Sequence, residues 1–205
     1  MNEVKVLEEK LKQLYDGVYF DGNRSNYRKT GGYWEYPIFS IQASLIKQIF
    51  NPTRALDAGC AKGFLVHHLR KLGVDAFGTD ISEYAIQAAG SEVQPYVQTA
   101  VMHALPFPDN YFDTVVSFEV MEHIPGPFLT QSIAELARVA SKTLFFTIAR
   151  EGDTSDKTHF SLLPVQTWVE KFQSVGLTYD VNATKFILSQ PLVMQMQWQP
   201  YVFHK

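Results

Sequence analysis

The feature that most constrains the fold is an alternation of short apolar runs with segments of helical period. Strand-length runs are expected at Arg54–Ala58, Asp75–Asp80, Tyr96–Val101, Thr114–Glu119 and Lys142–Ile148. Helices are expected at Phe64–Leu72, Ser82–Ala89, Phe128–Ala140 and Pro164–Ser174. Further strands near Leu177–Val181 and Gln199–His204 would bring the number to seven. Such alternation predicts an α/β fold with a doubly wound, mostly parallel sheet.

The first 50 residues do not follow this alternation. Val4, Leu7, Leu11 and Leu14 recur at helical spacing and predict an amphipathic helix. A loop rich in Gly, Asn and Tyr follows over Tyr19–Pro37, and a helix is expected over Ile38–Phe50. We therefore expect one domain, 1–205, in which 1–50 form helices and a lid and 51–205 form the core.

Composition limits the classes of function. The chain of 205 residues has a formal net charge of −3 and no long Lys/Arg run, which disfavours a nucleic-acid partner. Its one cysteine excludes an intrachain disulfide. No apolar stretch has the length of a membrane span, and Met1–Lys12 lacks a hydrophobic signal core, so the expected location is cytoplasmic. Nothing here indicates an oligomeric state.

The segment ALDAGCAKG, Ala55–Gly63, has the pattern of a strand, a glycine turn and a helix start. Gly59 and Gly63 remove the Cβ atoms that would keep a ligand from the backbone. The free N–H groups at the helix start suit a carboxylate or a phosphate. Tight turns alone also produce such patterns.

Asp80, in FGTDIS, ends the next expected strand. An acidic residue at this place accepts hydrogen bonds from ribose hydroxyls and disfavours a 2′-phosphate. The alternative interpretation is an Asp that caps the helix beginning near Ser82.

A third motif, ALPFPDNYFDTVVSFEVMEHIP, covers Ala104–Pro125. Together with DAGCAKG and Asp80, it resembles the class I methyltransferases, over roughly Ala55–Gly176. The resemblance implies a Rossmann-like fold and S-adenosylmethionine as cofactor, with Gly59 and its neighbours at the methionine moiety and Asp80 at the ribose.

One departure from that pattern concerns the adenine. Such enzymes often carry Asp where this chain has Val101, so backbone groups of Val101 and Met102 are expected to hold the base instead. We interpret Cys60 as a small buried residue and not as a nucleophile. The full set of expected cofactor-binding residues is Asp57, Gly59, Cys60, Gly63, Asp80, Ile81, Val101, Met102 and Phe118.

An E-x-x-E-H cluster follows the fourth expected strand, with Glu119, Glu122 and His123, and His159 follows the fifth in DKTHFSLLP. These motifs resemble the ubiquinone-pathway O-methyltransferases and, more loosely, the small-RNA 3′-end ribose methyltransferases. The resemblance implies a divalent ion, Mg, Mn or Zn, held by Glu119, Glu122, His123 and His159. In metal-free relatives the same residues bind cofactor or act as a base, and the base here would be His123 or His159.

The loop before the core is expected to act as a lid. Tyr27, Tyr33 and Trp34 could cover a ligand, and Arg28 could meet a carboxylate, although aromatic loops also pack without any ligand.

The function that these features favour is methyl transfer from S-adenosylmethionine to an oxygen of a small molecule, with or without a metal. Methylation of a nitrogen, of a peptide or of an RNA end is the alternative within the class. Two further alternatives lie outside the methyltransferase class: an inactive cofactor-binding accessory protein and an NAD-dependent oxidoreductase. The oxidoreductase is disfavoured because no full G-x-G-x-x-G occurs.

Overall fold

The computed structural model describes residues 3–22, 31–153, 156–196 and 198–205. The chain divides into two compact units, Met1–Met102 and His103–Lys205. Each unit is a succession of helices and strands. The expectation that the whole chain forms one domain stays a prediction.

The first unit contains a three-stranded parallel sheet in the order β3-β2-β1. Its strands are β1 (Arg54–Ala58), β2 (Asp75–Asp80) and β3 (Val97–Thr99). Its helices are α1 (Glu3–Leu14), α2 (Gly17–Phe20), α3 (Pro37–Phe50), α4 (Phe64–Lys71) and α5 (Glu83–Gln87), with a 3-10 turn at Gln94–Tyr96.

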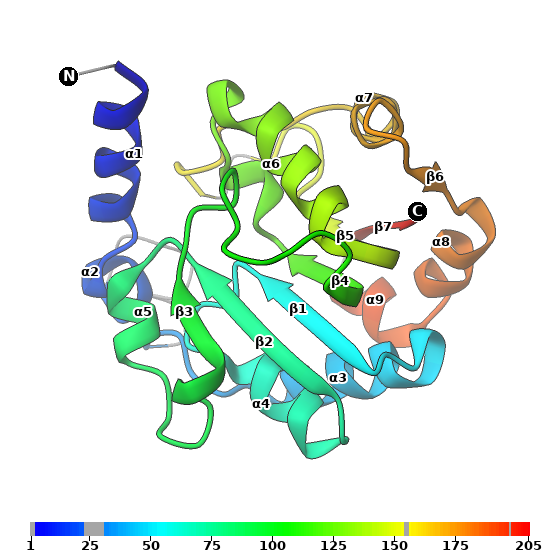
Figure 1. The fold of residues 1–205 in the computed structure, drawn as a ribbon, viewed down its shortest axis with the longest axis horizontal. Helices are drawn as coiled ribbons and strands as arrows, with labels where there is room; N and C mark the ends of the chain where they lie inside the picture. Colours follow the sequence, from blue (N-terminus) through cyan, green and yellow to red (C-terminus); the bar gives the residue numbers. More distant parts are fainter. Residues whose placement is uncertain (1–2, 23–30, 154–155, 197) are drawn as a thin grey trace. The chain divides into compact units, whose positions relative to one another are not determined.

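Local sequence explains where these helices start and stop. The Asp16 and Ser82 side chains cap α2 and α5 by accepting hydrogen bonds from Tyr19 N–H and Ala85 N–H. Asn51 ends α3 in the left-handed conformation, at φ 42°. Helix α4 packs against β1 and β2, and α3 packs on α4 (Figure 1).

The second unit contains four strands in the order β4-β5-β7-β6. They are β4 (Phe112–Phe118), β5 (Ala140–Ile148), β6 (Thr178–Tyr179) and β7 (Gln199–His204). The helices are α6 (Gly126–Val139), α7 (Val165–Gln173), α8 (Val181–Leu188) and α9 (Pro191–Met196), with a 3-10 turn at Met121–His123.

Strand direction in this unit changes at β7. Strands β4 and β5 are parallel, whereas β7 runs antiparallel to both of its neighbours, β5 and β6. A buried aromatic group holds α7 to the sheet: the Phe172 ring lies 4.8 Å from the Phe146 ring and 4.6 Å from the Phe203 ring, centroid to centroid. The unit therefore has its own apolar core.

The expected α/β fold with a mostly parallel seven-stranded sheet is confirmed. Three of the expected strands, Arg54–Ala58, Asp75–Asp80 and Gln199–His204, have the expected bounds, while the one expected at Tyr96–Val101 is shorter, at Val97–Thr99. The expected loop over Tyr19–Pro37 was wrong at both ends, because Tyr19 and Phe20 belong to α2 and Pro37 begins α3. Residues 23–30 of that loop lie outside the described part. No described helix is both long and apolar enough to cross a membrane.

Gly78, in the middle of β2, has a packing role that explains Cys60. A Cβ atom at Gly78 would lie 2.6 Å from Cys60 Sγ and 2.9 Å from a Val66 methyl carbon. Cys60 is 3% exposed, so its thiol fills the space that the glycine leaves. The cysteine is therefore part of the core beneath the glycine turn.

We predict that Gly78→Ala lowers the free energy of unfolding by roughly 1–3 kcal/mol, because the buried thiol and Val66 must move. Gly90→Ala is the matched control, since no atom lies within 4 Å of a Cβ built there. Urea denaturation of both variants measures the difference. Equal stability of the two would show that the thiol is not tightly packed.

Candidate functional site

The glycine turn between β1 and α4 is held in an unusual backbone conformation. Gly59 has φ 90° and Gly63, the N-cap of α4, has φ 75°, both in the region that glycine adopts without strain. The backbone N–H groups of Gly59 and Cys60 both donate to the Thr79 carbonyl of β2, at 2.7 and 2.9 Å. The turn is thus fixed to the neighbouring strand at the carboxyl end of the sheet.

Ala61 in the same turn also lies in the left-handed region, at φ 48°, which is costly for a residue with a Cβ atom. Its N–H donates to Asp80 Oδ2 at 2.8 Å, and Ser82 N–H donates to Asp80 Oδ1 at 2.8 Å. One carboxylate therefore holds the turn after β1 and the loop after β2. Asp80 is not the cap of α5, because Ser82 is the N-cap, but its carboxylate holds the loop that leads into that helix. Ribose binding stays a prediction that these contacts do not prevent, because each carboxylate oxygen can accept more than one hydrogen bond.

Two carboxyl groups stand at this end of the sheet: Asp57 is buried and Asp80 is half-buried. Burial, reinforced by the charge of Asp80, raises the pKa of Asp57 to about 8. Burial also raises the pKa of Asp80, although hydrogen bonds from Ser82 and Ala61 oppose the shift. Such a pair favours ligand groups that donate hydrogen bonds or carry positive charge.

The remaining residues expected at the cofactor occupy different places. Burial raises the pKa of the Cys60 thiol well above its ordinary value, which fits a packed thiol and not a nucleophile. Ile81, Val101 and Met102 are half-buried and follow β2 and β3. Phe118 ends β4 in the second unit, where its ring packs 5.1 Å from the Phe145 ring.

A buried ion pair joins the N-terminal segment to the glycine turn, and sequence reasoning did not find it. Lys62 Nζ donates to both Asp21 oxygens, at 2.6 and 2.8 Å, and the Lys62 side chain is 7% exposed. The Tyr84 hydroxyl also donates to Asp21, at 2.6 Å. Burial pushes the pKa of Asp21 up, but the hydrogen bonds from Lys62 and Tyr84 outweigh it and leave that pKa below its ordinary value.

Two of the four residues expected in the lid are described. The Tyr33 ring stacks on Phe64 of α4 at 5.7 Å, and its N–H donates to Asp21 Oδ1. The Trp34 ring lies 5.4 Å from Lys62 Nζ, within cation–π range, and is 54% exposed. Tyr27 and Arg28 lie outside the described residues.

In the second unit, three of the four residues expected to bind a metal come together. Glu122, His123 and His159 each offer a ligand atom within 4.8 Å of the others. Glu122 is fully buried, its Oε1 accepts from Ala149 N–H at 3.1 Å, and no described group donates to its Oε2. A buried carboxylate oxygen without a donor is a plausible ligand atom for a cation.

Hydrogen bonds fix the tautomers of both histidines. His123 Nδ1 lies 3.0 Å from the Thr158 carbonyl and 2.9 Å from its hydroxyl, which itself donates to Asp156. His159 Nδ1 lies 3.2 Å from the Asp153 carbonyl. A carbonyl only accepts, so both Nδ1 atoms carry a proton, and in the neutral imidazole the lone pair is on Nε2. Sequence reasoning missed Thr158 and Asp156, although both lie beside His159 in the chain.

The surroundings of His123 favour its neutral form. Burial, together with the neighbouring His159, lowers the pKa of His123 to about 4, so His123 is neutral at pH 7. Burial, together with the charge of Glu119, raises the pKa of Glu122 well above its ordinary value. The cluster therefore combines a neutral His123 imidazole with a Glu122 carboxyl group whose pKa is raised.

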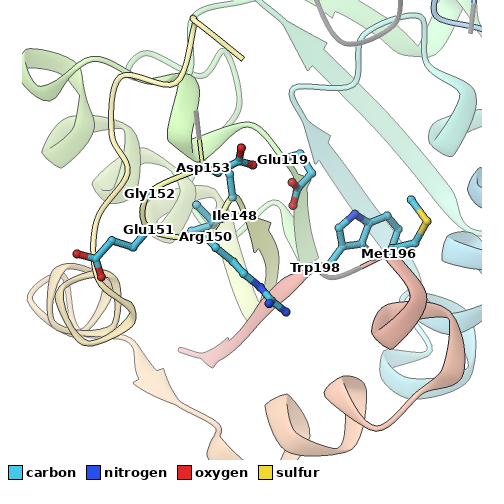
Figure 2. A pocket seen from close by; sticks show the side chains of 9 residues that line it. Glu119, Ile148, Arg150, Glu151, Gly152, Asp153, Met196 and Trp198 are labelled. Carbon is cyan, nitrogen blue, oxygen red and sulfur yellow. The ribbon is translucent and has the colours of Figure 1, made fainter. Parts of the chain in front are cut away.

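Glu119, the fourth expected ligand, stands at the end of β4 with φ 53°, a conformation that is strained for a glutamate. Its N–H donates to the Thr147 carbonyl at 2.9 Å, and no described group donates to its buried Oε1. Glu119 also lines a pocket of about 480 Å³, whose other lining residues are Ile148, Ala149, Arg150, Glu151, Gly152, Asp153, Met196 and Trp198 (Figure 2).

Comparison with known proteins agrees with these features. Residues 56–146, from β1 into β5, match the family model of the methyltransferase domain. The expected resemblance to the class I S-adenosylmethionine-dependent methyltransferases is thereby confirmed.

Particular relatives are the ubiquinone biosynthesis O-methyltransferases of Proteus mirabilis (strain HI4320) and Aeromonas salmonicida (strain A449). The first is 28% identical over 148 residues, which cover 68% of this chain and 57% of the relative. The second is 33% identical over 105 residues, which cover 47% of this chain and 44% of the relative. The chain thus spans about half the length of these curated relatives.

Solved structures show the same fold. One is magnesium protoporphyrin IX methyltransferase from Synechocystis PCC 6803 with bound S-adenosylmethionine. It has a TM-score of 0.68 at 16% identity, and the match covers 100% of this chain and 98% of that protein. The [4+2]-cyclase SpnF has a TM-score of 0.62 at 17% identity, and the match covers 84% of this chain and 74% of SpnF.

We predict that Asp21→Ala lowers the free energy of unfolding by roughly 3 kcal/mol, because it leaves the buried Lys62 ammonium unpaired. The double variant Asp21→Ala/Lys62→Met should recover much of that loss, since it removes the uncompensated charge. Chemical denaturation of the two single variants and the double variant measures the coupling. Strictly additive losses would contradict a functioning ion pair.

Proposed function

We propose that this chain is an S-adenosylmethionine-dependent methyltransferase that acts on an oxygen of a small molecule. The observation that carries the proposal is the glycine turn held open by Asp80, within the segment that matches the methyltransferase domain. S-adenosylmethionine, when bound, supplies an electrophilic methyl group, so the protein must mainly position the acceptor and remove its proton.

The residues of the first unit fit such a cofactor. The backbone of Gly59–Gly63 can approach a ligand closely, as its φ angles allow at Gly59 and Gly63. Asp57 and Asp80 offer carboxyl oxygens with raised pKa values to hydroxyl or ammonium groups. We assign the methionine moiety to Asp57, Gly59, Cys60 and Gly63, the ribose to Asp80 and Ile81, and the adenine surroundings to Val101, Met102 and Phe118.

We further propose that the second unit binds a divalent ion through Glu122 Oε2 and the Nε2 atoms of His123 and His159, with Glu119 as the fourth ligand. The fixed tautomers support this proposal, because both Nε2 lone pairs are available and both Nδ1 atoms are already bonded. The nitrogen and carboxylate donors suit Mn or Zn, and Mg less well. A bound ion would lower the pKa of an acceptor hydroxyl.

The same geometry supports a second mechanism, without a metal. His123 is neutral at pH 7 and its Nε2 has a lone pair, so it could accept the proton of the acceptor hydroxyl. Thr158 and Asp156 would then orient the imidazole, as in other relays of this kind. Chelation distinguishes the two mechanisms.

For the cofactor, we predict that the protein binds S-adenosylhomocysteine and that Asp80→Ala weakens the binding at least tenfold. The variant loses hydrogen bonds to the ribose, worth roughly 1.5–3 kcal/mol each, and the support of Ala61. It should also unfold more easily, because two backbone N–H groups lose their acceptor.

Asp75→Ala, at the opposite end of β2, is the control and should bind normally. Titration calorimetry gives the dissociation constants of the variants. Unchanged affinity in folded Asp80→Ala would exclude the ribose role, and binding of NAD in place of S-adenosyl compounds would overturn the class of enzyme.

For the metal, we predict that Glu122→Gln loses Mn²⁺ binding and that Thr158→Val weakens it about 10–100-fold, because the Thr158 hydroxyl supports the His123 tautomer. Thr158→Ser keeps the hydroxyl and should bind almost as the parent does. Calorimetry with Mn²⁺ or Zn²⁺ measures these affinities, with S-adenosylhomocysteine binding as a check that the variants are folded. Full methyl transfer after EDTA treatment would reject the metal and leave a histidine base.

A further inference from the structure

We propose that Arg150 and Trp198 select the acceptor, and that the pocket of Figure 2 takes a planar hydroxylated ring that also carries an anionic group. This inference rests on the proposed function and goes further, because it assigns the selection of the acceptor to Arg150 and Trp198, which belong to neither the cofactor motif nor the metal motif. All of the residues that line this pocket belong to the second unit.

The pocket has the size of a small-molecule site. Its volume of about 480 Å³ falls within the range of roughly 300–1,000 Å³ that is usual for such sites. One wall is the turn after β5, which reverses at Gly152 with φ 81°, and the other comes from Met196 and Trp198, just before β7. A single ring with short substituents fits this space.

Arg150 supplies positive charge to this pocket. Among the described residues, no carboxylate forms an ion pair with its guanidinium group, although Glu119, Glu151 and Asp153 also line the pocket. In Figure 2 the Arg150 side chain extends toward the side of Trp198, whereas Glu151 points away. An unpaired guanidinium group beside a cavity is suited to binding a carboxylate through two parallel hydrogen bonds.

Trp198 supplies a planar surface beside that charge. Its ring packs 5.9 Å from the Phe118 ring, which fixes it on one side, and the residue is only half-buried. Aromatic rings stack favourably on such a surface at little cost in side-chain entropy. Met196, 44% exposed, adds an adaptable apolar contact.

Glu119 sets the orientation of the ring. Its buried Oε1, which no described group reaches, can accept a hydrogen bond from a hydroxyl group of the ligand. The hydroxyl would then face Glu119 while the anionic group faces Arg150. The turn that carries Arg150 also holds His159, through the Asp153 carbonyl at 3.2 Å, so acceptor recognition and the histidine cluster share one loop.

The test compares two probes that differ only in charge, 3-hydroxybenzoate and 3-hydroxybenzamide, bound to the whole protein with S-adenosylhomocysteine present. We expect the parent protein to bind the acid at least tenfold more tightly than the amide. Arg150→Gln should abolish that preference and leave the amide affinity within about twofold. Trp198→Leu should weaken binding of both probes.

Lys142→Gln removes an exposed cation at the other end of β5 and should change nothing. Equal binding of acid and amide by the parent protein, binding of neither, or an unaltered preference in Arg150→Gln would each overturn the inference. The proposed function fails separately, if S-adenosylhomocysteine does not bind. A preference for the acid that persists in that case would still support the pocket assignment.

Discussion

The carboxylate of Asp80 is the interaction on which the first unit most depends. Its two oxygens hold Ala61 in a left-handed conformation and set the loop that leads into α5. Without an acceptor there, Ala61 would lose the hydrogen bond that offsets its backbone strain. The Asp80 side chain from the adjacent strand thus holds the conformation of the glycine turn, and the pKa of this half-buried carboxyl group is raised.

Much of the fold could be predicted from sequence, because buried parallel strands are short apolar runs between helical segments. Helices α8 and α9 were not predicted, since each is short and exposes Phe186 or Met194, which obscures the helical period. The convergence of Glu122, His123 and His159 could be expected, because each follows the carboxyl end of a strand. Lys62 and Asp21 could not be paired, because no periodic pattern links residues 41 positions apart.

The fold alone does not determine the reaction. A [4+2]-cyclase and a porphyrin methyltransferase both share it with this chain at under 20% identity. What separates such proteins is the set of side chains at the strand ends, and here these are two imidazoles with defined tautomers, a strained glutamate and an arginine beside a tryptophan. On the assignments proposed above, the residues that meet the acceptor all belong to the second unit.

The position of β7 has a consequence for how the second unit is assembled. β7 follows β6 in the chain but lies between β5 and β6 in the sheet. The short β6 therefore cannot join the sheet until β7 has paired with β5, across the whole of α7, α8 and α9 in sequence. During synthesis, the turn that carries Arg150 would emerge from the ribosome well before the tryptophan that faces it across the pocket, and the recognition surface would form last.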